Sequence, residues 1–169
     1  MPRSSLPRSS LPRLKFLAML GASAAVPLAA ACSGGPAQAK SYPVTYSDAE
    51  WRRRLSPDQY EILRRKGTEV AGTSPLLHEK RTGTFVCAAD GHPLFASSTK
   101  YDSRTGWPSF WQPLPGAIGT ATDWDGGIPR TEVLCAQCGG HLGHVFDDGP
   151  RPTGKRYCMN GDALAFRPV

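Results

Sequence analysis

The sequence predicts a mainly antiparallel β domain that is preceded by two short helices. Two helix-start patterns occur before residue 67, and in each a serine is followed three residues later by a glutamate or glutamine. From Gly83 onward the chain consists of short β-branched and aromatic runs that are separated by glycine and proline turns. Helices followed by many short strands indicate this fold class, and the sequence contains no internal repeat.

The first 31 residues differ from the rest and are typical of an export signal. Residues 1–15 carry basic and no acidic side chains, and residues 16–31 form an apolar run that is short for a membrane span. The run ends in a pattern similar to a lipoprotein cleavage site, which makes Cys32 the predicted lipidation residue and residues 32–45 a tether. Ordinary cleavage after Ala39 is the alternative. We expect an exported, periplasmic protein, anchored to the membrane if Cys32 is lipidated.

The charge balance argues against nucleic-acid binding. The chain has 20 Lys and Arg against 14 Asp and Glu, but four of the basic residues and none of the acidic ones precede Cys32. The remainder is therefore nearly neutral and has no basic patch of the nucleic-acid-binding kind. A lipid on Cys32 would be the only contact with a membrane that the sequence predicts.

Two helices and a loop open the predicted domain, which covers residues 46–169. The first helix is predicted over residues 47–55 and the second over 56–67, where Pro57 at the first helical position costs no hydrogen bond. The second helix should turn Tyr60 and Leu63 inward. A polar loop is predicted to follow it, over residues 69–80.

Short strands make up the rest of the predicted domain. Residues 100–115 contain two tryptophans and several turn formers, so we expect no regular element there. A hairpin is predicted around Asp125-Gly126-Gly127. The predicted strands are residues 84–87, 93–95, 117–124, 128–135, 144–146, 156–159 and 164–166.

Four residues with matching spacing suggest a structural metal site. Cys135 and Cys138 form a C-x-x-C pattern at a strand end, and the two glycines that follow let both thiolates point at one metal. Cys87 and Asp90 repeat this spacing, and a carboxylate can complete the four ligands of structural zinc. The sequence thus predicts a zinc site, with a disulfide between Cys135 and Cys138 in an oxidising compartment as the alternative.

The stretch Gly139–Phe166 holds the residues that are best suited to chemistry. It contains Cys158 and two histidines, His141 and His144. A cysteine with histidines elsewhere in the chain is a candidate nucleophile, because a nearby cation favours the reactive thiolate. On these residues alone, a buried structural cysteine is the alternative.

Four motifs in order resemble those of the peptide-methionine (R)-S-oxide reductases of type B. They are PLF at 93–95, KYDSRTGWPSFW at 100–111, GGHLGHVFDDGP at 139–150 and PTGKRYCMNG at 152–161. The match extends from about residue 46 to residue 167. The resemblance implies two twisted antiparallel sheets, known as the β-tent fold, and an oxidoreductase that repairs methionine-R-sulfoxide in proteins.

The resemblance also implies roles for individual residues. Cys158 is expected to attack the sulfoxide sulfur and to become a sulfenic acid. The residues matching Arg156 and Asn160 lie beside the nucleophile in the family, and those matching His141 and His144 form the polar wall that holds the sulfoxide oxygen. We predict that His144 acts as the acid or organises water, with His141 as its support.

Three more residues receive predicted roles. Asp148 is expected to orient a histidine or Arg156. Trp107 is expected to pack against the ε-methyl group of the substrate, and Phe146 is predicted to bind substrate as well. A flat apolar wall beside a polar one would distinguish the two epimers of a chiral sulfoxide.

Two positions depart from the family pattern. Thr105 stands where many members carry the resolving cysteine, so we expect an external thiol, thioredoxin-like or small, to reset Cys158. Asp90 stands where zinc-type members carry a cysteine, so either the metal site is weakened or zinc is lost and Cys87 is freed.

The main prediction is therefore an exported, monomeric repair enzyme without an organic cofactor. A zinc-stabilised β-tent binding module that has lost catalysis is the alternative from another class. The intact set of predicted catalytic residues argues against it, because a binding module has no reason to keep a reactive thiol beside imidazoles. A thiol–disulfide oxidoreductase using Cys135 and Cys138 would lack the βαβ context in which that motif is redox-active.

Overall fold

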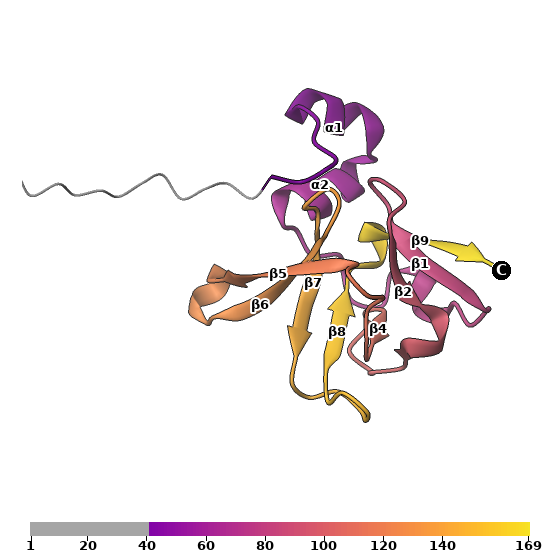
Figure 1. Ribbon diagram of the computed structural model, residues 1–169. Coiled ribbons are helices and arrows are strands. Elements are labelled where there is room, and N and C mark those ends of the chain that lie inside the picture. The colour runs from indigo at the N-terminus through magenta and orange to yellow at the C-terminus, as the bar shows by residue number, and fades with distance from the viewer. Residues whose placement is uncertain (1–40) are drawn as a thin grey trace, which may run out of the picture. The chain divides into compact units, whose positions relative to one another are not determined.

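The computed structural model describes residues 41–169 (Figure 1). The predicted export signal, the predicted lipidation residue Cys32 and most of the predicted tether lie outside the described residues. Val44, near the end of that tether, contacts the folded domain. Its N–H donates to the carbonyl of Gln137 at 2.9 Å, and its side chain packs against the core. No helix among the described residues is long and apolar enough to cross a membrane.

Two short helices precede the sheets, as their serine caps predict. Helix α1 spans Asp48–Arg54 and α2 spans Pro57–Arg65. The Ser56 hydroxyl accepts from the N–H of Gln59, and the Gln59 side chain accepts from the N–H of Ser56, so this capping box is complete. Lys66 ends α2 in the left-handed conformation, just before the predicted stop. The side chains that the helices bury are Trp51, Tyr60, Ile62 and Leu63.

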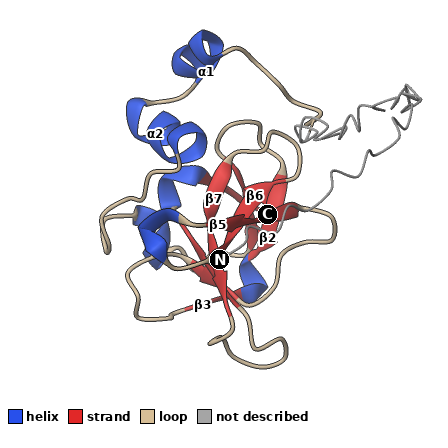
Figure 2. Ribbon diagram, turned by 90° about the vertical axis from the view of Figure 1, so that its left-hand side faces the viewer, coloured by secondary structure: helices blue, strands red, loops and turns tan. Residues whose placement is uncertain are grey.

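The strands form two antiparallel sheets, which confirms the predicted fold class (Figure 1). One sheet has the order β2-β1-β9 and the other β3-β4-β8-β7-β6-β5. Figure 2 shows both helices at one end of the strands, with α2 next to β7. The strands are β1 (Gly83–Cys87), β2 (Pro93–Ala96), β3 (Lys100–Tyr101), β4 (Ser109–Phe110), β5 (Ile118–Asp123), β6 (Arg130–Cys135), β7 (His141–Phe146), β8 (Arg156–Met159) and β9 (Leu164–Pro168).

The segment 100–115 is more regular than we predicted. It contains two strands of two residues each, β3 and β4. Tyr101 of β3 pairs with Ser109 of β4, and Ser109 also pairs with Cys158 of β8. Strands this short show no alternating pattern in the sequence, and their conformation follows from pairing with β8.

Two further differences from the prediction exceed a shift of one or two residues at the end of an element. The predicted loop at 69–80 contains a 3₁₀ turn, Pro75–His78, which Ser74 caps. Strand β7 begins at His141 rather than at residue 144, because a bulge interrupts the alternation from which a strand is recognised.

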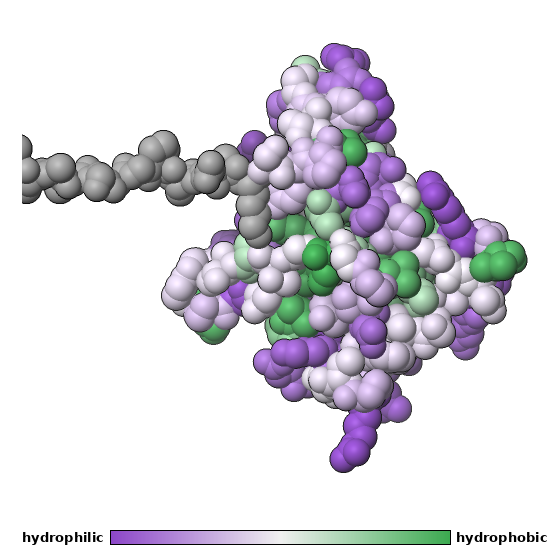
Figure 3. Space-filling view, in the orientation of Figure 1, coloured by the Kyte–Doolittle hydropathy of each residue, from purple (hydrophilic) through white to green (hydrophobic). Residues whose placement is uncertain are grey.

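The core is rich in aromatic side chains. Phe95 stacks on Phe110 with ring centroids 4.3 Å apart, and Phe85 packs edge-on against Phe110 at 4.9 Å. Leu142 and Met159 belong to the same buried cluster. Figure 3 shows the face of the molecule that is seen in Figure 1. Hydrophilic residues lie mainly over the helices and the outer parts of this face, and apolar residues lie nearer its middle. Core side chains thus fix β4, β7 and β8, the strands that carry the candidate site.

Candidate active site

A bulge in β7 places two histidines on the same face of the larger sheet. Residues three apart in a strand normally face opposite sides, because side chains alternate. The register between β6 and β7 passes from Val133–Gly143 directly to Leu134–His141, so β7 accommodates one extra residue. His141 therefore turns to the side of His144, and the two rings lie 5.3 Å apart, edge to face.

Gly143 makes this bulge sterically allowed. Its φ of 152° lies in a region that favours glycine, and a Cβ at this position would overlap the carbonyl of Cys158 on β8. The glycine between the two histidines thus determines both their direction and the close approach of β8.

A buried carboxylate holds His141. Its Nδ1–H donates to Glu132 Oε1 at 2.8 Å, and Lys66 Nζ donates to Oε2 at 2.8 Å. Burial lowers the pKa of His141 and outweighs the opposing effect of Glu132, so the imidazole is neutral at pH 7. Its Nε2 is buried and has no hydrogen-bond partner among residues 41–169.

A second carboxylate holds His144. The Nε2–H of His144 donates to Asp123 Oδ2 at 2.7 Å, and Arg130 Nη2 donates to the same oxygen at 2.8 Å. The pKa of Asp123 is lowered to about 2, first by the N–H of Asp125 and then by His144. Asp123 is therefore ionised at neutral pH and determines that Nε2 of His144 carries a proton.

Cys158 lies within β8, between β4 and β7. It pairs in register with Ser109 on one side and with His144 on the other. The residue is half-buried, and its Sγ lies 3.8 Å from Thr105 Oγ1. A reactive thiol must be both reachable and close to polar groups, and this position meets both conditions.

A pocket of about 130 Å³ opens over Cys158; we call it the Cys158 pocket. Its lining combines the aromatic side chains of Trp107 and Phe146 with the polar side chains of His144 and Asn160. It is small beside the roughly 300–1,000 Å³ of sites for drug-sized ligands, so it suits the end of a single side chain. The other lining residues are Thr68, Arg130, Gly143 and Met159.

Glu69 fixes two walls of this pocket. Its carbonyl accepts from Trp107 Nε1 at 3.2 Å, and its N–H donates to Asn160 Oδ1 at 3.1 Å. Asn160 Nδ2 donates to the carbonyl of Leu142 at 3.2 Å, so both ends of the amide are engaged. The Glu69 carboxylate accepts from the N–H of Gly161 at 2.6 Å, and burial raises its pKa. A loop distant in sequence thus orients both Trp107 and Asn160.

Arg156 and Asp148 form a bidentate pair beside the pocket. Nε and Nη2 of Arg156 donate to the two carboxylate oxygens at 2.8 Å each. The pair raises the pKa of Arg156 and lowers that of Asp148. The guanidinium lies 4.3 Å from the ring centroid of Phe146 and close enough to Cys158 to interact with its charge. Asp148 therefore contacts one of its two predicted partners, Arg156, and neither residue lines the Cys158 pocket.

The four predicted metal ligands come together and form what we call the metal cluster: Cys87, Asp90, Cys135 and Cys138. Their ligand atoms all lie within 4.8 Å of one another. Tetrahedral zinc, with bonds of about 2.3 Å to sulfur and 2.0 Å to oxygen, separates two sulfurs by roughly 3.8 Å and sulfur from oxygen by roughly 3.5 Å. Cys87 Sγ and Cys138 Sγ are 3.8 Å apart, and Cys135 Sγ is 3.5 Å from Asp90 Oδ2. The donor set therefore fits one tetrahedral ion.

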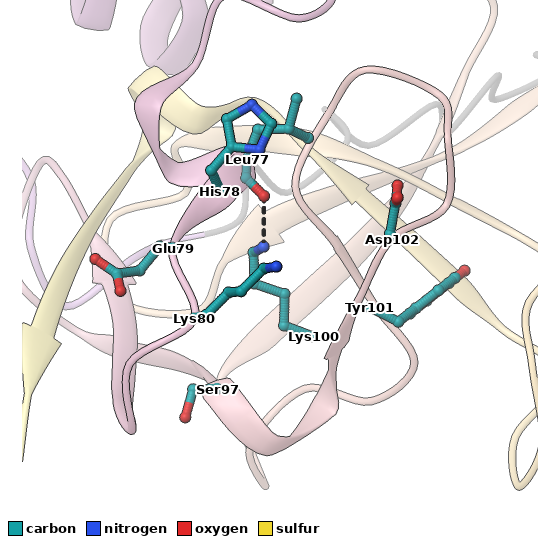
Figure 4. Close-up of a pocket in the computed structure, with 8 residues that line it drawn as sticks. All are labelled: Leu77, His78, Glu79, Lys80, Ser97, Lys100, Tyr101 and Asp102. Atoms are coloured by element: carbon teal, nitrogen blue, oxygen red, sulfur yellow. Dashed lines mark hydrogen bonds between the residues drawn. The ribbon is translucent and has the colours of Figure 1, made fainter.

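A further cavity, of about 390 Å³, shares no lining residue with the Cys158 pocket (Figure 4). Lys100 Nζ donates to the carbonyl of Leu77 at 2.8 Å, and burial lowers the pKa of Lys100. Figure 4 shows Lys80 beside Lys100, with Tyr101 pointing away from both. This cavity contains no thiol, and we assign it no part in the chemistry.

Known proteins with similar sequences allow the family to be stated. A SelR domain model matches residues 55–168. A peptide methionine sulfoxide reductase MsrB of Leptospira interrogans is 55% identical over 128 residues, which cover 75% of this chain and 98% of the relative. The chain belongs to the peptide methionine sulfoxide reductase MsrB family. This confirms the resemblance that the four motifs predict.

Two other members of the MsrB family give a similar result. The MsrB of Agrobacterium fabrum is 53% identical over 127 residues, covering 75% of this chain and 94% of the relative. The chloroplastic peptide methionine sulfoxide reductase B1 of Arabidopsis thaliana is 55% identical over 119 residues, covering 70% of this chain and 59% of the relative. The similarity thus includes both bacterial and plant proteins.

Reasoning from the sequence missed the groups that hold the motif residues of this MsrB family member. Glu132 and Asp123 support the histidines, and Glu69 supports Trp107 and Asn160. An acid within the otherwise apolar run that ends β6 is a signal of a buried polar partner, since buried acids are rare unless paired. Asp123 and Glu69 lie at a strand end and in a loop, where acids are ordinary and give no such signal.

Proposed function

We propose that this protein reduces methionine-R-sulfoxide in oxidised proteins back to methionine. The observation that carries the proposal is the half-buried Cys158 thiol, which lines one pocket together with Trp107, Phe146 and His144. Each relative described above is named as a peptide methionine sulfoxide reductase. Site geometry and family membership therefore support the same activity.

The reaction transfers oxygen from the substrate sulfur to the sulfur of the enzyme. The thiolate of Cys158 attacks the sulfoxide sulfur while the sulfoxide oxygen is protonated, which forms a sulfur–sulfur bond. The hydroxyl group then passes to the sulfur of Cys158 as this bond and the sulfur–oxygen bond break, and methionine leaves with its sulfur reduced. Cys158 is oxidised to a sulfenic acid. His144, whose Nε2–H is held by Asp123, supplies or organises the proton, and the neutral His141 supports its ring.

The two walls of the pocket give a physical basis for selecting one epimer. The ε-methyl group packs on the aromatic side chain of Trp107, and the sulfoxide oxygen faces the polar side chains of His144 and Asn160. In the other epimer methyl and oxygen exchange places, so the oxygen meets an apolar wall and loses its hydrogen bonds. An unmade hydrogen bond of this kind costs about 1–3 kcal/mol.

An external thiol resets Cys158. The other described cysteines, Cys87, Cys135 and Cys138, are buried together in the metal cluster, and Thr105 beside Cys158 has no thiol. One reductant thiol condenses with the sulfenic acid to give a mixed disulfide and water. A second thiol attacks that disulfide and releases the Cys158 thiol and an oxidised reductant.

The metal cluster holds a structural zinc ion in this proposal. Cys87 and Asp90 flank the turn after β1, and Cys135 and Cys138 form the knuckle after β6, so zinc would link two segments distant in sequence. The ion would contribute to folding and not to the reaction. Metal analysis of the purified protein tests this, and less than about half an equivalent of zinc would reject it.

We further propose that the protein is an exported monomer that acts in the periplasm. The support is the basic start and apolar run of the first 31 residues, with Cys32 as the residue that would carry a lipid anchor. Fractionation of cells and the mass of the processed protein test the location, and size-exclusion chromatography tests the monomer.

The decisive experiment is an activity assay on both epimers of a methyl sulfoxide substrate. We expect turnover of the R epimer with thioredoxin or with a small thiol as the reductant. Activity confined to the S epimer, or no activity with either reductant, would overturn the proposal. An intramolecular disulfide to Cys158 after one turnover, detected by mass spectrometry, would overturn the external reset alone.

A further inference from the structure

A chain of three hydroxyl groups leads from the main chain to the sulfur of Cys158. Thr105 Oγ1 lies 3.8 Å from Cys158 Sγ and 2.8 Å from Ser103 Oγ. Ser103 Oγ lies 2.7 Å from Ser109 Oγ, and Ser109 donates to the carbonyl oxygen of Trp107 at 3.1 Å. Ser109 is fully buried and pairs with Cys158 in register, so the chain is part of the folded sheet.

The last bond determines the direction of the whole chain, because each hydroxyl has a single proton. The carbonyl of Trp107 can only accept, so its contact with Ser109 and the contact between Ser109 and Ser103 are both hydrogen bonds only when the proton of Ser109 points at the carbonyl. Ser103 must then donate to Ser109, and Thr105 must donate to Ser103. Thr105 therefore has only lone pairs to offer to Cys158, and their contact becomes a hydrogen bond only when the cysteine carries the proton.

We propose that Thr105 is a positioning residue that stabilises the neutral forms of Cys158, the thiol before turnover and the sulfenic acid after it. This inference rests on the proposed function and deepens it. A sulfenic acid that donates to Thr105 Oγ1 stays protonated, and the protonated acid is the form whose sulfur a thiolate attacks. The attack joins the reductant sulfur to Cys158 and releases the sulfenic oxygen as water, with one proton from each partner.

Thr105 therefore does more than lack a thiol. In place of an intramolecular disulfide, the hydroxyl chain offers the sulfenic acid an acceptor, Thr105 Oγ1. Before turnover, the same acceptor stabilises the protonated thiol of Cys158 relative to its thiolate. A substrate or a neighbouring cation then favours ionisation.

Reversing the direction of the hydrogen bonds along the three hydroxyl groups tests this inference. In a Ser109→Ala variant the proton of Ser103 loses its acceptor and turns to Thr105, whose own proton then points at Cys158. We expect alkylation of Cys158 by iodoacetamide at pH 7 to become about fivefold faster, the size of exchanging one hydrogen bond. Mass spectrometry of the peptide that contains Cys158 measures the rate. An unchanged or slower rate would overturn the proposal.

The pH dependence separates this effect from a loosened structure. The increase in Ser109→Ala should disappear at high pH, where the thiol is ionised in every variant. An increase that persists at high pH would indicate greater exposure and would also overturn the proposal. The charged or titratable groups around Cys158 are unchanged by the substitution; they are Arg130 on β6, His144 on β7, Arg156 on β8 and Tyr101 on β3.

The sulfenic acid is tested without the proposed activity. One equivalent of hydrogen peroxide oxidises Cys158, and a small thiol is then added. We expect the mixed disulfide to form about fivefold more slowly in Ser109→Ala than in the wild type, whereas an equal or faster rate would contradict the inference. If the wild type does not reduce the sulfoxide, the proposed function is refuted, but the rates of mixed-disulfide formation in the two proteins can still be compared.

Three further variants serve as a replacement for Ser109→Ala, if it does not fold, and as controls for unspecific effects. Ser103→Ala frees the proton of Thr105 by another route and should reproduce both effects if Ser109→Ala does not fold. Thr105→Ser keeps the hydroxyl and should behave as the wild type. Ser98→Ala changes an exposed serine outside the chain and should have no effect. A change of similar size in Ser98→Ala or Thr105→Ser would overturn the proposal.

Discussion

The metal cluster and the Cys158 pocket place the same side chain in opposite surroundings. In the cluster, three buried thiols and the carboxylate of Asp90 converge within 4.8 Å, an arrangement that fits a tetrahedral ion. In the pocket, Cys158 is the only thiol, is half-buried and has Thr105 and His144 as neighbours. In our proposal, the first arrangement uses thiolates as zinc ligands and the second exposes one as a nucleophile.

The separation of the two regions follows from the sheet. Glu132 on β6 lies opposite His144, which lies opposite Cys158, and Cys135 is three residues further along β6. Three residues along a strand and two strands across each correspond to roughly 10 Å. The cluster thiols are therefore too far away to form a disulfide with Cys158 without rearrangement, since bridged Cα atoms lie within about 7 Å.

The largest expected effect comes from removing the pocket thiol. Cys158→Ser should lower sulfoxide reduction by about 10³-fold or more, because a hydroxyl is a far weaker nucleophile than a thiolate. Its zinc content and melting temperature should match those of the wild type, since the metal cluster is untouched. Initial rates and thermal unfolding measure this, and residual activity within tenfold of the wild type would refute Cys158 as the nucleophile.

The matching substitution in the metal cluster is Cys138→Ser, which should lower the stability of the fold. Losing a ligand of structural zinc should lower the melting temperature by on the order of 10 °C and reduce the bound zinc. Treatment of the wild type with a chelator should have the same effect, whereas Cys158→Ser should respond to the chelator as the wild type does. A Cys138→Ser protein with unchanged zinc content and melting temperature would show that the cluster is not a metal site.

Most residues of the metal cluster and of the Cys158 pocket could be predicted from the sequence, because motif residues and ligand spacing are local patterns. Cys158, His144, Trp107 and Asn160 meet in one pocket, and the C-x-x-C and C-x-x-D pairs converge. Both regions are assembled at strand ends or on paired strands whose pairing follows from the fold class.

The missing parts are those that depend on contacts between distant segments. The bulge that turns His141 toward His144 depends on the register between β6 and β7. Gly143 is the residue type that indicates it in the sequence. The carboxylate of Glu132 becomes a partner of His141 only once β6 and β7 are paired. The hydroxyl chain below Cys158 requires β4, which is too short to be predicted by periodicity.

A smaller effect should come from the support of His144. Asp123→Asn keeps an oxygen that can accept from Nε2–H but removes the charge that also pairs with Arg130. We expect about a tenfold loss of kcat/KM, part of the 10²–10⁴-fold that a general acid contributes. Steady-state kinetics on the R epimer measure this, and an unchanged kcat/KM would show that His144 does not need the charge.

The same variant predicts a change in acid stability. The pKa of Asp123 in the folded protein is about 2, below its ordinary value of about 4, so its ionised form stabilises the fold above pH 4. That stabilisation is lost as the pH falls from 4 to 2, and Asp123→Asn cannot lose it. Urea unfolding at several pH values should therefore show a shallower decline for the variant in this window; parallel curves would contradict the shift.

The smallest effect is expected at Asp90, which has two tasks in the metal cluster. Its Oδ1 accepts from the N–H of His92 at 2.8 Å and supports the turn after β1, while Oδ2 lies 3.5 Å from Cys135 Sγ. Asp90→Cys supplies a softer ligand but loses the turn bond, so the melting temperature should change by only about 2–4 °C. Resistance to a chelator should rise about tenfold, since an all-thiolate set binds zinc more tightly.

Asp90→Asn is the matched control, because it keeps the acceptor for His92 and loses only the charged ligand. It should release zinc more readily than the wild type, and both Asp90 variants should keep sulfoxide reduction within about twofold. Competition with a chromogenic chelator measures zinc release. Equal release from Asp90→Asn and the wild type would mean that Asp90 serves the turn alone, and that the remaining cysteines hold the metal without it.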